Sequence, residues 1–257
     1  MSSVISESAL NDLAQITDHT PTILVHGGGN TVTSIAEKLG VHQKFVTSPE
    51  GFRSRYTDAE TIQVFTMVMA GKINKEIVQR LQGRKISGIG LSGIDGALIR
   101  GERKQKLVVK DERGRRRMIE GGYTGKVTRV DGSLLQTLLT AGYVPVIAPI
   151  ALGSENELLN LDGDRTAAYV AGAVRADILL LLTDVEGVSL TGTVVPRLNA
   201  AEAKRRIPDL GPGMITKVYA ALEALSMGVS KVMISSGHRE NPFTSAIEGQ
   251  AGTVVES

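Results

Sequence analysis

The chain has 257 residues, of which 42% are hydrophobic, so it can build one large α/β domain or two lobes on a shared sheet. A formal charge of +2 gives no general case for nucleic-acid binding. The absence of cysteine excludes disulfides, thiolate metal sites and a cysteine nucleophile. Apolar runs such as residues 143–152 are too short to cross a bilayer, and residues 1–7 lack the features of a secretion signal. We therefore expect a cytoplasmic protein that binds neither membranes nor nucleic acid.

Short apolar runs alternate with helix-like segments along the chain. We expect strands at residues 22–25, 85–91, 144–150, 177–182 and 231–235. We expect helices at residues 30–39, 58–81, 132–140, 164–174, 199–207 and 213–227, and a short one beginning near residue 241. This alternation predicts a three-layer αβα sandwich with a mainly parallel central sheet.

Two segments have more specific local features. Thr57 and Glu60 have the spacing of a capping box, in which both side chains satisfy free N–H groups, so the helix at 58–81 is expected to begin there. Residues 100–121 predict a β-hairpin that stands off the main sheet, with its turn at 111–114. Nine basic residues and three acidic ones fall within 100–117. Such a patch attracts acidic partners, although an ordinary solvated hairpin has the same composition.

Two glycine-rich segments are candidates for binding sites. Residues 26–30, His-Gly-Gly-Gly-Asn, follow a predicted strand and open a predicted helix, which is typical of an anion site and also of a tight turn. Residues 88–93 match G-x-G-x-x-G, but no convincing helix follows them. We therefore interpret these glycines as a loop lining a site rather than as a dinucleotide fingerprint.

Charged residues beside predicted helix starts are further candidates. Arg55 comes directly before the helix at 58–81, where it could grip a carboxylate or form only a surface ion pair. Residues 160–164, Asn-Leu-Asp-Gly-Asp, end a strand and start a helix, and they could serve the site or simply cap the helix. Lys217 lies in the first turn of a helix, where the helix dipole is unfavourable to a cation, so we expect an anionic partner there.

The order of these motifs along the chain resembles the amino-acid kinase superfamily, in its acetylglutamate kinase branch. The matching segments are residues 25–29, 54–58, 160–164, 183–188 and 213–217. Residues 54–58 and 121–125, together with the basic hairpin, resemble the LysZ-type kinases of that branch. Those kinases phosphorylate 2-aminoadipate or glutamate while its amino group is attached to the acidic carrier protein LysW, in lysine or arginine biosynthesis.

The resemblance implies roles for individual residues on the acceptor side. Gly27 and Gly28 would hold the transferring phosphoryl group, and Arg55 and Asn160 would bind the substrate. This acceptor site would belong to an N-terminal lobe at residues 1–175. The residues implied to dock the carrier are Arg113, Arg115, Arg116 and Arg117.

The resemblance also implies a nucleotide side, in a C-terminal lobe at residues 176–257. Lys217 would neutralise charge on the transferring phosphate, and Asp164 would orient the lysines at the reaction centre. The residues implied to surround the nucleotide are Thr183, Asp184, Gly211, Gly213 and Met214. The cofactors implied are ATP and Mg²⁺, with the ion held mainly by the nucleotide phosphates and by no metal site of the protein. A homodimer through the helix at 58–81 is also implied.

Three points stay open at this stage. Kinases of the superfamily begin with a strand carrying Lys-x-Gly-Gly, which this sequence lacks, so we expect either a start further upstream or a missing central strand and phosphate-binding lysine. Acetylglutamate kinase and a non-catalytic nucleotide-binding relative are the alternatives, with a nicotinamide oxidoreductase a distant third. Aminoadipate and glutamate differ by one methylene, worth only about 1–3 kcal/mol of discrimination, and these residues do not separate them.

Overall fold

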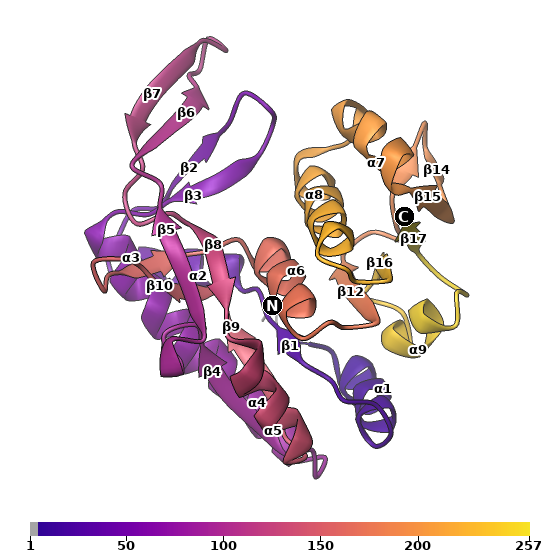
Figure 1. Ribbon diagram of the computed structural model, residues 1–257. Helices are drawn as coiled ribbons and strands as arrows, with labels where there is room; N and C mark the ends of the chain where they lie inside the picture. Colours follow the sequence, from indigo (N-terminus) through magenta and orange to yellow (C-terminus); the bar gives the residue numbers. More distant parts are fainter. Residues whose placement is uncertain (1–4) are drawn as a thin grey trace.

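The computed structural model describes residues 5–257, which form an α/β fold with a larger N-terminal half and a smaller C-terminal half (Figure 1). The helices are α1 (Glu7–Thr17), α2 (Gly29–Lys38), α3 (Ala59–Thr66), the π-helical η1 (Met67–Ile73), α4 (Asn74–Gln82), the 3₁₀ turn η2 (Asp95–Ala97), α5 (Gly132–Thr140), α6 (Gly163–Ala173), α7 (Ala200–Arg206), the 3₁₀ turn η3 (Ile207–Asp209), α8 (Pro212–Ser226) and α9 (Pro242–Ile247).

The strands of the N-terminal half come before α6. They are β1 (Leu24–Val25), β2 (Lys44–Thr47), β3 (Arg53–Tyr56), β4 (Gly88–Ser92), β5 (Ile99–Arg103), β6 (Lys106–Lys110), β7 (Arg116–Glu120), β8 (Gly125–Val130), β9 (Val144–Ala148), β10 (Ile150–Leu152) and β11 (Leu158–Asn160). Those of the C-terminal half are β12 (Ile178–Thr183), β13 (Ser189–Leu190), β14 (Thr193–Val194), β15 (Arg197–Asn199), β16 (Lys231–Ser236) and β17 (Thr253–Glu256).

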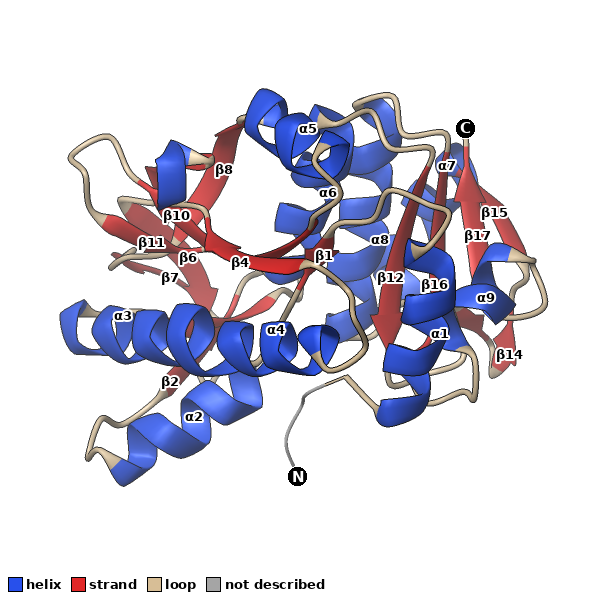
Figure 2. Ribbon diagram, turned by 90° about the horizontal axis from the view of Figure 1, so that it is seen from below, coloured by secondary structure: helices blue, strands red, loops and turns tan. Residues whose placement is uncertain are grey.

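Each half has a sheet between helical layers. In the N-terminal half, β1, β9 and β4 form a parallel sheet with α4 on one face and α5 and α6 on the other (Figure 2). In the C-terminal half the order is β12-β16-β17-β15, with only the β16–β17 pair antiparallel. The predicted three-layer sandwich with a mainly parallel sheet is therefore confirmed. Its strands form two separately hydrogen-bonded sheets, with β1 and β12 as outer strands among the described residues.

A third sheet carries the predicted hairpin. Strands β11-β10-β5-β8 form this sheet, and the β6–β7 ribbon extends from it beside the β2–β3 ribbon (Figure 1). Asp111 closes the hairpin turn, because its carboxylate accepts hydrogen bonds of 2.9 Å from the backbone N–H groups of Arg113 and Arg115. The hairpin predicted at 100–121 is confirmed, with its ribbon at residues 106–120.

The helix predicted at 58–81 differs in two ways. It spans α3, η1 and α4, so seven residues of π-helix replace α-helix in its middle. The predicted capping box at Thr57 is wrong, because the Asp58 carboxylate accepts the hydrogen bond from Thr61 N at 2.9 Å. Thr57 is buried and its hydroxyl is used elsewhere: it donates to Arg55 O and accepts from Asn160 Nδ2.

Buried apolar side chains form one core around α3, η1, α4 and β9, a second between α5, α6 and β5, and a third around β12, β16 and α8. Helix α1, which the sequence did not predict, closes the first core and also reaches the C-terminal half. The Asp12 carboxylate is buried and accepts hydrogen bonds from Phe243 N at 2.7 Å and Thr244 N at 3.0 Å, at the start of α9. Among residues 5–257, no helix combines the length and apolar character needed to span a membrane.

Candidate active site

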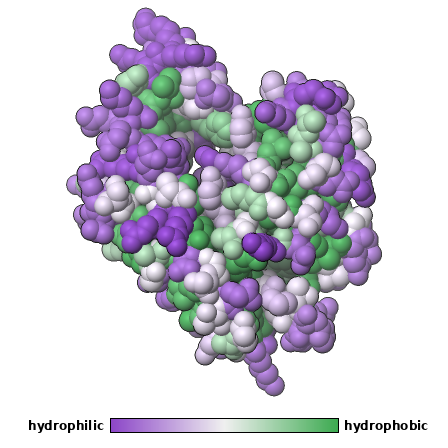
Figure 3. Space-filling view, viewed as in Figure 1, coloured by the Kyte–Doolittle hydropathy of each residue, from purple (hydrophilic) through white to green (hydrophobic). Residues whose placement is uncertain are grey.

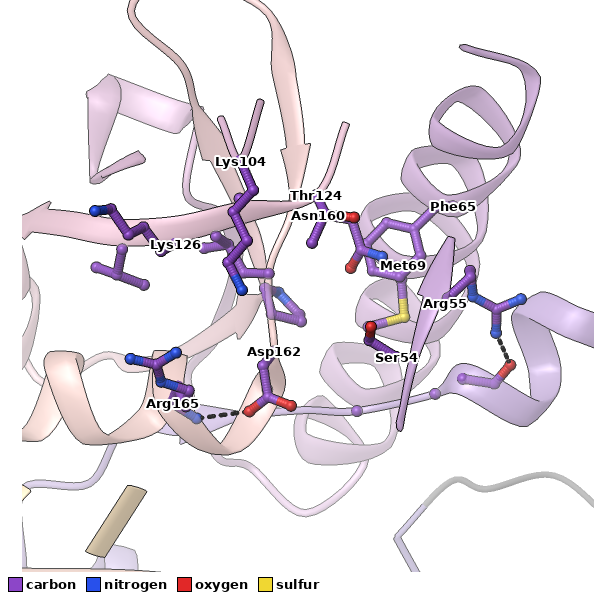
Figure 4. A pocket seen from close by; sticks show the side chains of 18 of the residues that line it. Ser54, Arg55, Phe65, Met69, Lys104, Thr124, Lys126, Asn160, Asp162 and Arg165 are labelled. Atoms are coloured by element: carbon purple, nitrogen blue, oxygen red, sulfur yellow. Dashed lines mark hydrogen bonds between the residues drawn. The ribbon is translucent and has the colours of Figure 1, made fainter. Parts of the chain in front are cut away.

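A cavity of about 270 Å³ opens where the loop after β1, strand β3, strand β8 and the start of α6 meet (Figure 4). The molecule is hollowed on this side, between the hydrophilic hairpin β6–β7 and the C-terminal half (Figure 3). Four of the predicted acceptor-side residues line the cavity: Gly27, Gly28, Arg55 and Asn160. They come from three separate parts of the sequence, so the fold brings together residues that the motifs only suggested.

The glycine loop contributes free backbone donors to this pocket. Within the described part of the chain, the N–H groups of Gly27 and Gly28 donate to no other residue. Gly28 has φ +151°, and a Cβ there would overlap Ile73 of η1, so only glycine fits between the loop and the helix. A Cβ at Gly27 would meet no heavy atom within 4 Å. The loop is therefore packed closely on one side and open on the other, where an oxyanion can approach its donors.

A buried polar pair holds the same loop from behind. Asn74, the first residue of α4, donates through Nδ2 to Val146 O at 2.8 Å and to His26 Nε2 at 3.3 Å. Because Nε2 accepts, the ring proton is on Nδ1, which donates to Gly27 O at 3.0 Å. Burial lowers the pKa of His26 below 6.5, which favours this neutral form. No pattern in the sequence indicated Asn74, because its role comes from contacts with β4 and β9.

Arg55 is a buried cation with no carboxylate partner among the described residues. Its guanidinium donates to Gly29 O at 2.7 Å, to Thr33 Oγ1 at 3.0 Å and to Gln43, and it lies 4.9 Å from the ring centre of Phe45. Only 8% of the residue is exposed, and this burial lowers the pKa of its guanidinium. Arg55 therefore forms no surface ion pair, and it brings an uncompensated positive charge to the pocket wall.

The start of α6 forms the floor of the pocket. The Asp162 carboxylate caps the helix by accepting from Arg165 N at 2.9 Å. The pocket walls desolvate this carboxylate, and together with the charge of Asp164 they raise its pKa. Arg165 forms a two-pronged ion pair with Glu223 of α8, with Nε 2.9 Å from Oε2. Asn160, just before this turn, donates to Thr57 Oγ1 at 2.8 Å and so ties β11 to the end of β3.

Lys217 and Asp164 are paired, so the expected anionic partner of Lys217 is present. The predicted position in the first turn of the helix is wrong, because α8 begins at Pro212 and Lys217 lies in its second turn. Lys217 Nζ donates to both carboxylate oxygens of Asp164, at 2.8 and 3.1 Å. Their side chains are only 15% and 25% exposed. The anionic partner that Lys217 needs is thus supplied by α6, and the pair joins the pocket floor to the C-terminal half.

The predicted nucleotide residues lie outside this pocket. Thr183 ends β12 and donates to Asp184 Oδ1 at 3.1 Å. Gly211 caps α8 at its N-terminus, and Gly213 follows in the first turn, with no heavy atom within 4 Å of a Cβ placed on either. Met214 packs against the C-terminal core. Lys217, on the same helix, connects this group to Asp164 and the pocket floor.

The interpretation of residues 88–93 as a loop lining a site is wrong. Residues 88–92 form strand β4, paired with β9, and they do not line the pocket. A Cβ at Gly90 would overlap the side chain of Asn74, so this glycine is explained by the close packing of α4 on the sheet. Lining residues that the sequence did not indicate include Lys104, Thr124, Lys126 and Tyr169.

The structure divides the predicted carrier patch. Arg115 pairs with Asp111 at the hairpin turn, at 2.8 Å. Arg116 and Arg117 are neighbours in β7, so they point to opposite faces of the ribbon. The cross-strand pairs Lys110–Arg116 and Val108–Met118 share one exposed face. Arg113 lies in the exposed turn.

Curated proteins of known family match nearly the whole chain. The chain is 51% identical over 249 residues to a "Putative [LysW]-aminoadipate/[LysW]-glutamate kinase" of Nitrosopumilus maritimus, covering 97% of this chain and 93% of the relative. It is 49% identical over 235 residues to the "[LysW]-aminoadipate/[LysW]-glutamate kinase" of Sulfolobus acidocaldarius, covering 91% and 89%.

Solved structures share the fold at low identity. A carbamate kinase from Giardia lamblia bound to AMP-PNP superposes with a TM-score of 0.65 at 13% identity, covering 96% of this chain and 89% of that one. The protein smu.665 from Streptococcus mutans superposes with a TM-score of 0.79 at 22% identity, covering 98% and 93%. The family model described as "Amino acid kinase family" matches residues 2–236, and the chain belongs to this family.

Proposed function

We propose that this protein is an ATP-dependent kinase that phosphorylates the side-chain carboxylate of 2-aminoadipate or glutamate attached to the carrier protein LysW, giving an acyl phosphate. The names of the relatives at 51% and 49% identity support this activity. The observation that carries the proposal is the uncompensated Arg55 beside the free N–H groups of Gly27 and Gly28, in one pocket. This arrangement suits a ligand with two anionic ends.

Arg55 and Asn160 bind the acceptor in this proposal. The guanidinium of Arg55 is already fixed by Gly29 O and Thr33, so little side-chain entropy is lost when a carboxylate binds. Asn160 is fixed through Thr57 in the same way. A rigid binding wall holds the acceptor at one distance from the glycine loop, which favours a productive alignment.

The transfer step needs positioning and neutralisation of charge. A side-chain carboxylate has a pKa of about 4.3 and is ionised at neutral pH, so no general base is required. The oxygen attacks the γ-phosphorus, the bond to the leaving ADP oxygen breaks, and the electron pair stays on ADP. The N–H groups of Gly27 and Gly28 stabilise the transferring phosphoryl oxygens, and Lys217 neutralises their growing charge. Asp164 holds the Lys217 ammonium in place through the hydrogen bond between them.

The C-terminal half, residues 176–257, binds the nucleotide in this proposal, and residues 1–175 bind the acceptor. Thr183, Asp184, Gly211, Gly213 and Met214 surround the nucleotide at the end of β12 and the start of α8. The open backbone at Gly211 and Gly213 suits a phosphate at a helix N-terminus. Mg²⁺ held by the nucleotide phosphates supplies further charge neutralisation when bound.

The hairpin β6–β7 receives the acidic carrier in this proposal. It stands beside the mouth of the pocket and carries Lys110, Arg113 and Arg116 on exposed positions (Figure 3). Positive charge at the entrance raises the association rate with an acidic protein, and this effect becomes smaller as the salt concentration rises. We also propose a homodimer formed through α3–η1–α4, where Met67 is 56% exposed.

The test is ATP-dependent formation of acyl phosphate, trapped with hydroxylamine. The acceptors are carrier-linked aminoadipate, carrier-linked glutamate and free acetylglutamate. Turnover of either carrier-linked acceptor alone supports the proposal and identifies the preferred one. Turnover of free acetylglutamate alone replaces it with acetylglutamate kinase activity. Nucleotide binding without turnover of any of the three identifies a non-catalytic relative.

A further inference from the structure

Lys104 is a second cation in the pocket with no partner of its own. It follows β5, lines the cavity and directs its ammonium group between Asp162 and Arg165 (Figure 4). Among the described residues, this ammonium makes no hydrogen bond and no ion pair within 4.0 Å. Burial and the charge of Arg165 lower the pKa of Lys104. A desolvated, unpaired ammonium is unfavourable in the free protein, so it favours an anionic ligand.

The neighbouring backbone holds Lys104 in this direction. Arg103, one residue earlier, stacks on Tyr123 at 4.5 Å from the ring centre and donates to Gly122 O at 2.5 Å. Successive side chains in an extended segment point to opposite sides, so Lys104 must face the pocket. The backbone of Lys104 is fixed as well, because its N–H donates to Thr124 O at 2.9 Å and its carbonyl packs against Gly121, where a Cβ would overlap it.

Thr124 adds a second unsatisfied group at the same wall. It is 7% exposed and lines the cavity, and its Oγ1 is buried without a hydrogen-bond partner. A buried hydroxyl without a partner costs stability unless a ligand supplies one. The backbone hydrogen bond from Lys104 N to Thr124 O makes these two residues neighbours. They lie apart from Arg55, whose partners are Gly29 and Thr33.

We propose that Lys104 and the Thr124 hydroxyl form a second oxyanion subsite, which binds an oxygen of the acceptor carboxylate or of the phosphoryl group that it receives. This inference rests on the proposed function and adds two specificity-determining residues to it. Two basic residues near Lys104 are already engaged in ion pairs within the chain: Arg165 is paired with Glu223, and Lys126 is paired with Glu102 at 2.9 Å. Lys104 is therefore the pocket lysine with charge available for a ligand.

The first test compares Lys104→Met and Lys104→Arg with the control Lys204→Met, at an exposed lysine of α7 outside the pocket, using whichever acceptor the wild type phosphorylates. A charged hydrogen bond lost from the subsite lowers kcat/KM by about 10- to 100-fold in Lys104→Met. Lys104→Arg recovers part of this loss, and Lys204→Met stays within about threefold of the wild type. Thr124→Val alone lowers kcat/KM by about fivefold, and it lowers kcat/KM by a smaller factor when Lys104→Met is already present.

A second readout does not depend on turnover, so it separates this inference from the proposed function. Lysines are reductively methylated with and without ligand, and mass spectrometry compares Lys104 with Lys204, which lies outside the pocket. If carrier-linked glutamate alone protects Lys104, the subsite binds the acceptor carboxylate. If ATP alone protects Lys104, the subsite binds an oxygen of the phosphoryl group. Protection by neither, or a Lys104→Met variant with unchanged kcat/KM, overturns the subsite even if the kinase activity is present.

Discussion

Lys217 and Asp164 form an ion pair of 2.8 Å that connects the second turn of α8 to the first turn of α6. The pair lies between the acceptor pocket, which Gly163 lines, and the helix start proposed to bind the nucleotide. In an unliganded protein Asp164 balances Lys217, and a bound phosphate competes for the same ammonium. This pair is therefore where the two halves of the proposed reaction meet.

The first prediction concerns this ion pair. Lys217→Ala removes a cation that acts mainly in the transition state, so kcat is expected to fall about 100- to 1,000-fold while the KM for the acceptor changes little. Asp164→Asn keeps the shape of the side chain but holds Lys217 less firmly, so we expect a smaller fall in kcat. Lys204→Ala on the exposed end of α7 is the matched control. Hydroxylamine trapping measures all three, and full activity in Lys217→Ala contradicts the role.

The second prediction concerns acceptor binding. Arg55→Lys keeps the charge but loses the fork that contacts Gly29 O, Thr33 and Gln43, so it leaves buried acceptors without donors. We expect the KM for the acceptor to rise about 10- to 100-fold, with the KM for ATP unchanged. Lys44→Arg, at an exposed position of the paired strand β2 and outside the pocket, is the control. Equal rises in the KM for ATP and the KM for the acceptor indicate a general disturbance of the fold and contradict a specific contact with the acceptor.

The third prediction contrasts two adjacent glycines. A Cβ at Gly28 overlaps Ile73 and needs a positive φ, so Gly28→Ala is expected to destabilise the protein by about 2–3 kcal/mol. The double variant with Ile73→Ala does not recover this, because it opens a cavity and leaves the backbone strained. Gly27→Ala has open space and is expected to keep the wild-type free energy of unfolding, within about 1 kcal/mol. Urea unfolding distinguishes them, and equal stabilities contradict the packing argument.

Much of the fold could be predicted because hydrophobic periodicity is local. The helix predicted at residues 132–140 has the observed bounds, and its cap is the Asp131 side chain directly before it. The π-helix η1 could not be predicted, because nothing in residues 67–73 distinguishes it from α-helix. Asn74 directly follows η1 and contacts His26, which is a tertiary relationship between residues far apart in the sequence.

The site was only partly predictable for a similar reason. Gly27, Arg55 and Asn160 lie beside strand ends and helix starts, where a sequence pattern has meaning. Lys104 lies in a hairpin rich in basic residues, and nothing in its neighbours indicates that it faces the pocket. Its direction depends on the contacts of the preceding residue, Arg103, which stacks on Tyr123 and donates to Gly122 O. Both partners lie about twenty residues further along the chain, so the sequence around Lys104 does not reveal them.

The fourth prediction is a pH dependence of stability. Burial lowers the pKa of His26 in the folded state below 6.5, so at pH below 6.5 the unfolded chain binds more protons than the native one. Stability from this residue is complete above pH 6.5 and decreases as the pH falls below it, by at most about 1.4 kcal/mol per pH unit. Protonation also forces Nε2–H against the Asn74 amide.

Urea unfolding between pH 7 and pH 5.5 measures this dependence. His26→Gln, which cannot be protonated, is expected to show a smaller decrease than the wild type, although its stability at pH 7 is lower. His42→Gln, at an exposed position, is expected to keep the wild-type decrease. Identical slopes in the wild type and His26→Gln rule out His26 as the source.

The last prediction concerns the hairpin face. Val108 and Met118 are directly paired across β6 and β7 and are 45% and 65% exposed, with Lys110 and Arg116 next to them. If the acidic carrier docks on this face, Arg116→Glu raises the KM for a carrier-linked acceptor by about 10-fold at low salt, and the effect shrinks as salt screens the charges. Arg117→Glu, on the opposite face of the same strand, has a smaller effect. Met118→Ser raises the KM with little dependence on salt, because it removes apolar contact area rather than charge. None of these changes affects the KM for ATP, and equal effects of Arg116→Glu and Arg117→Glu at every salt concentration contradict docking on one face.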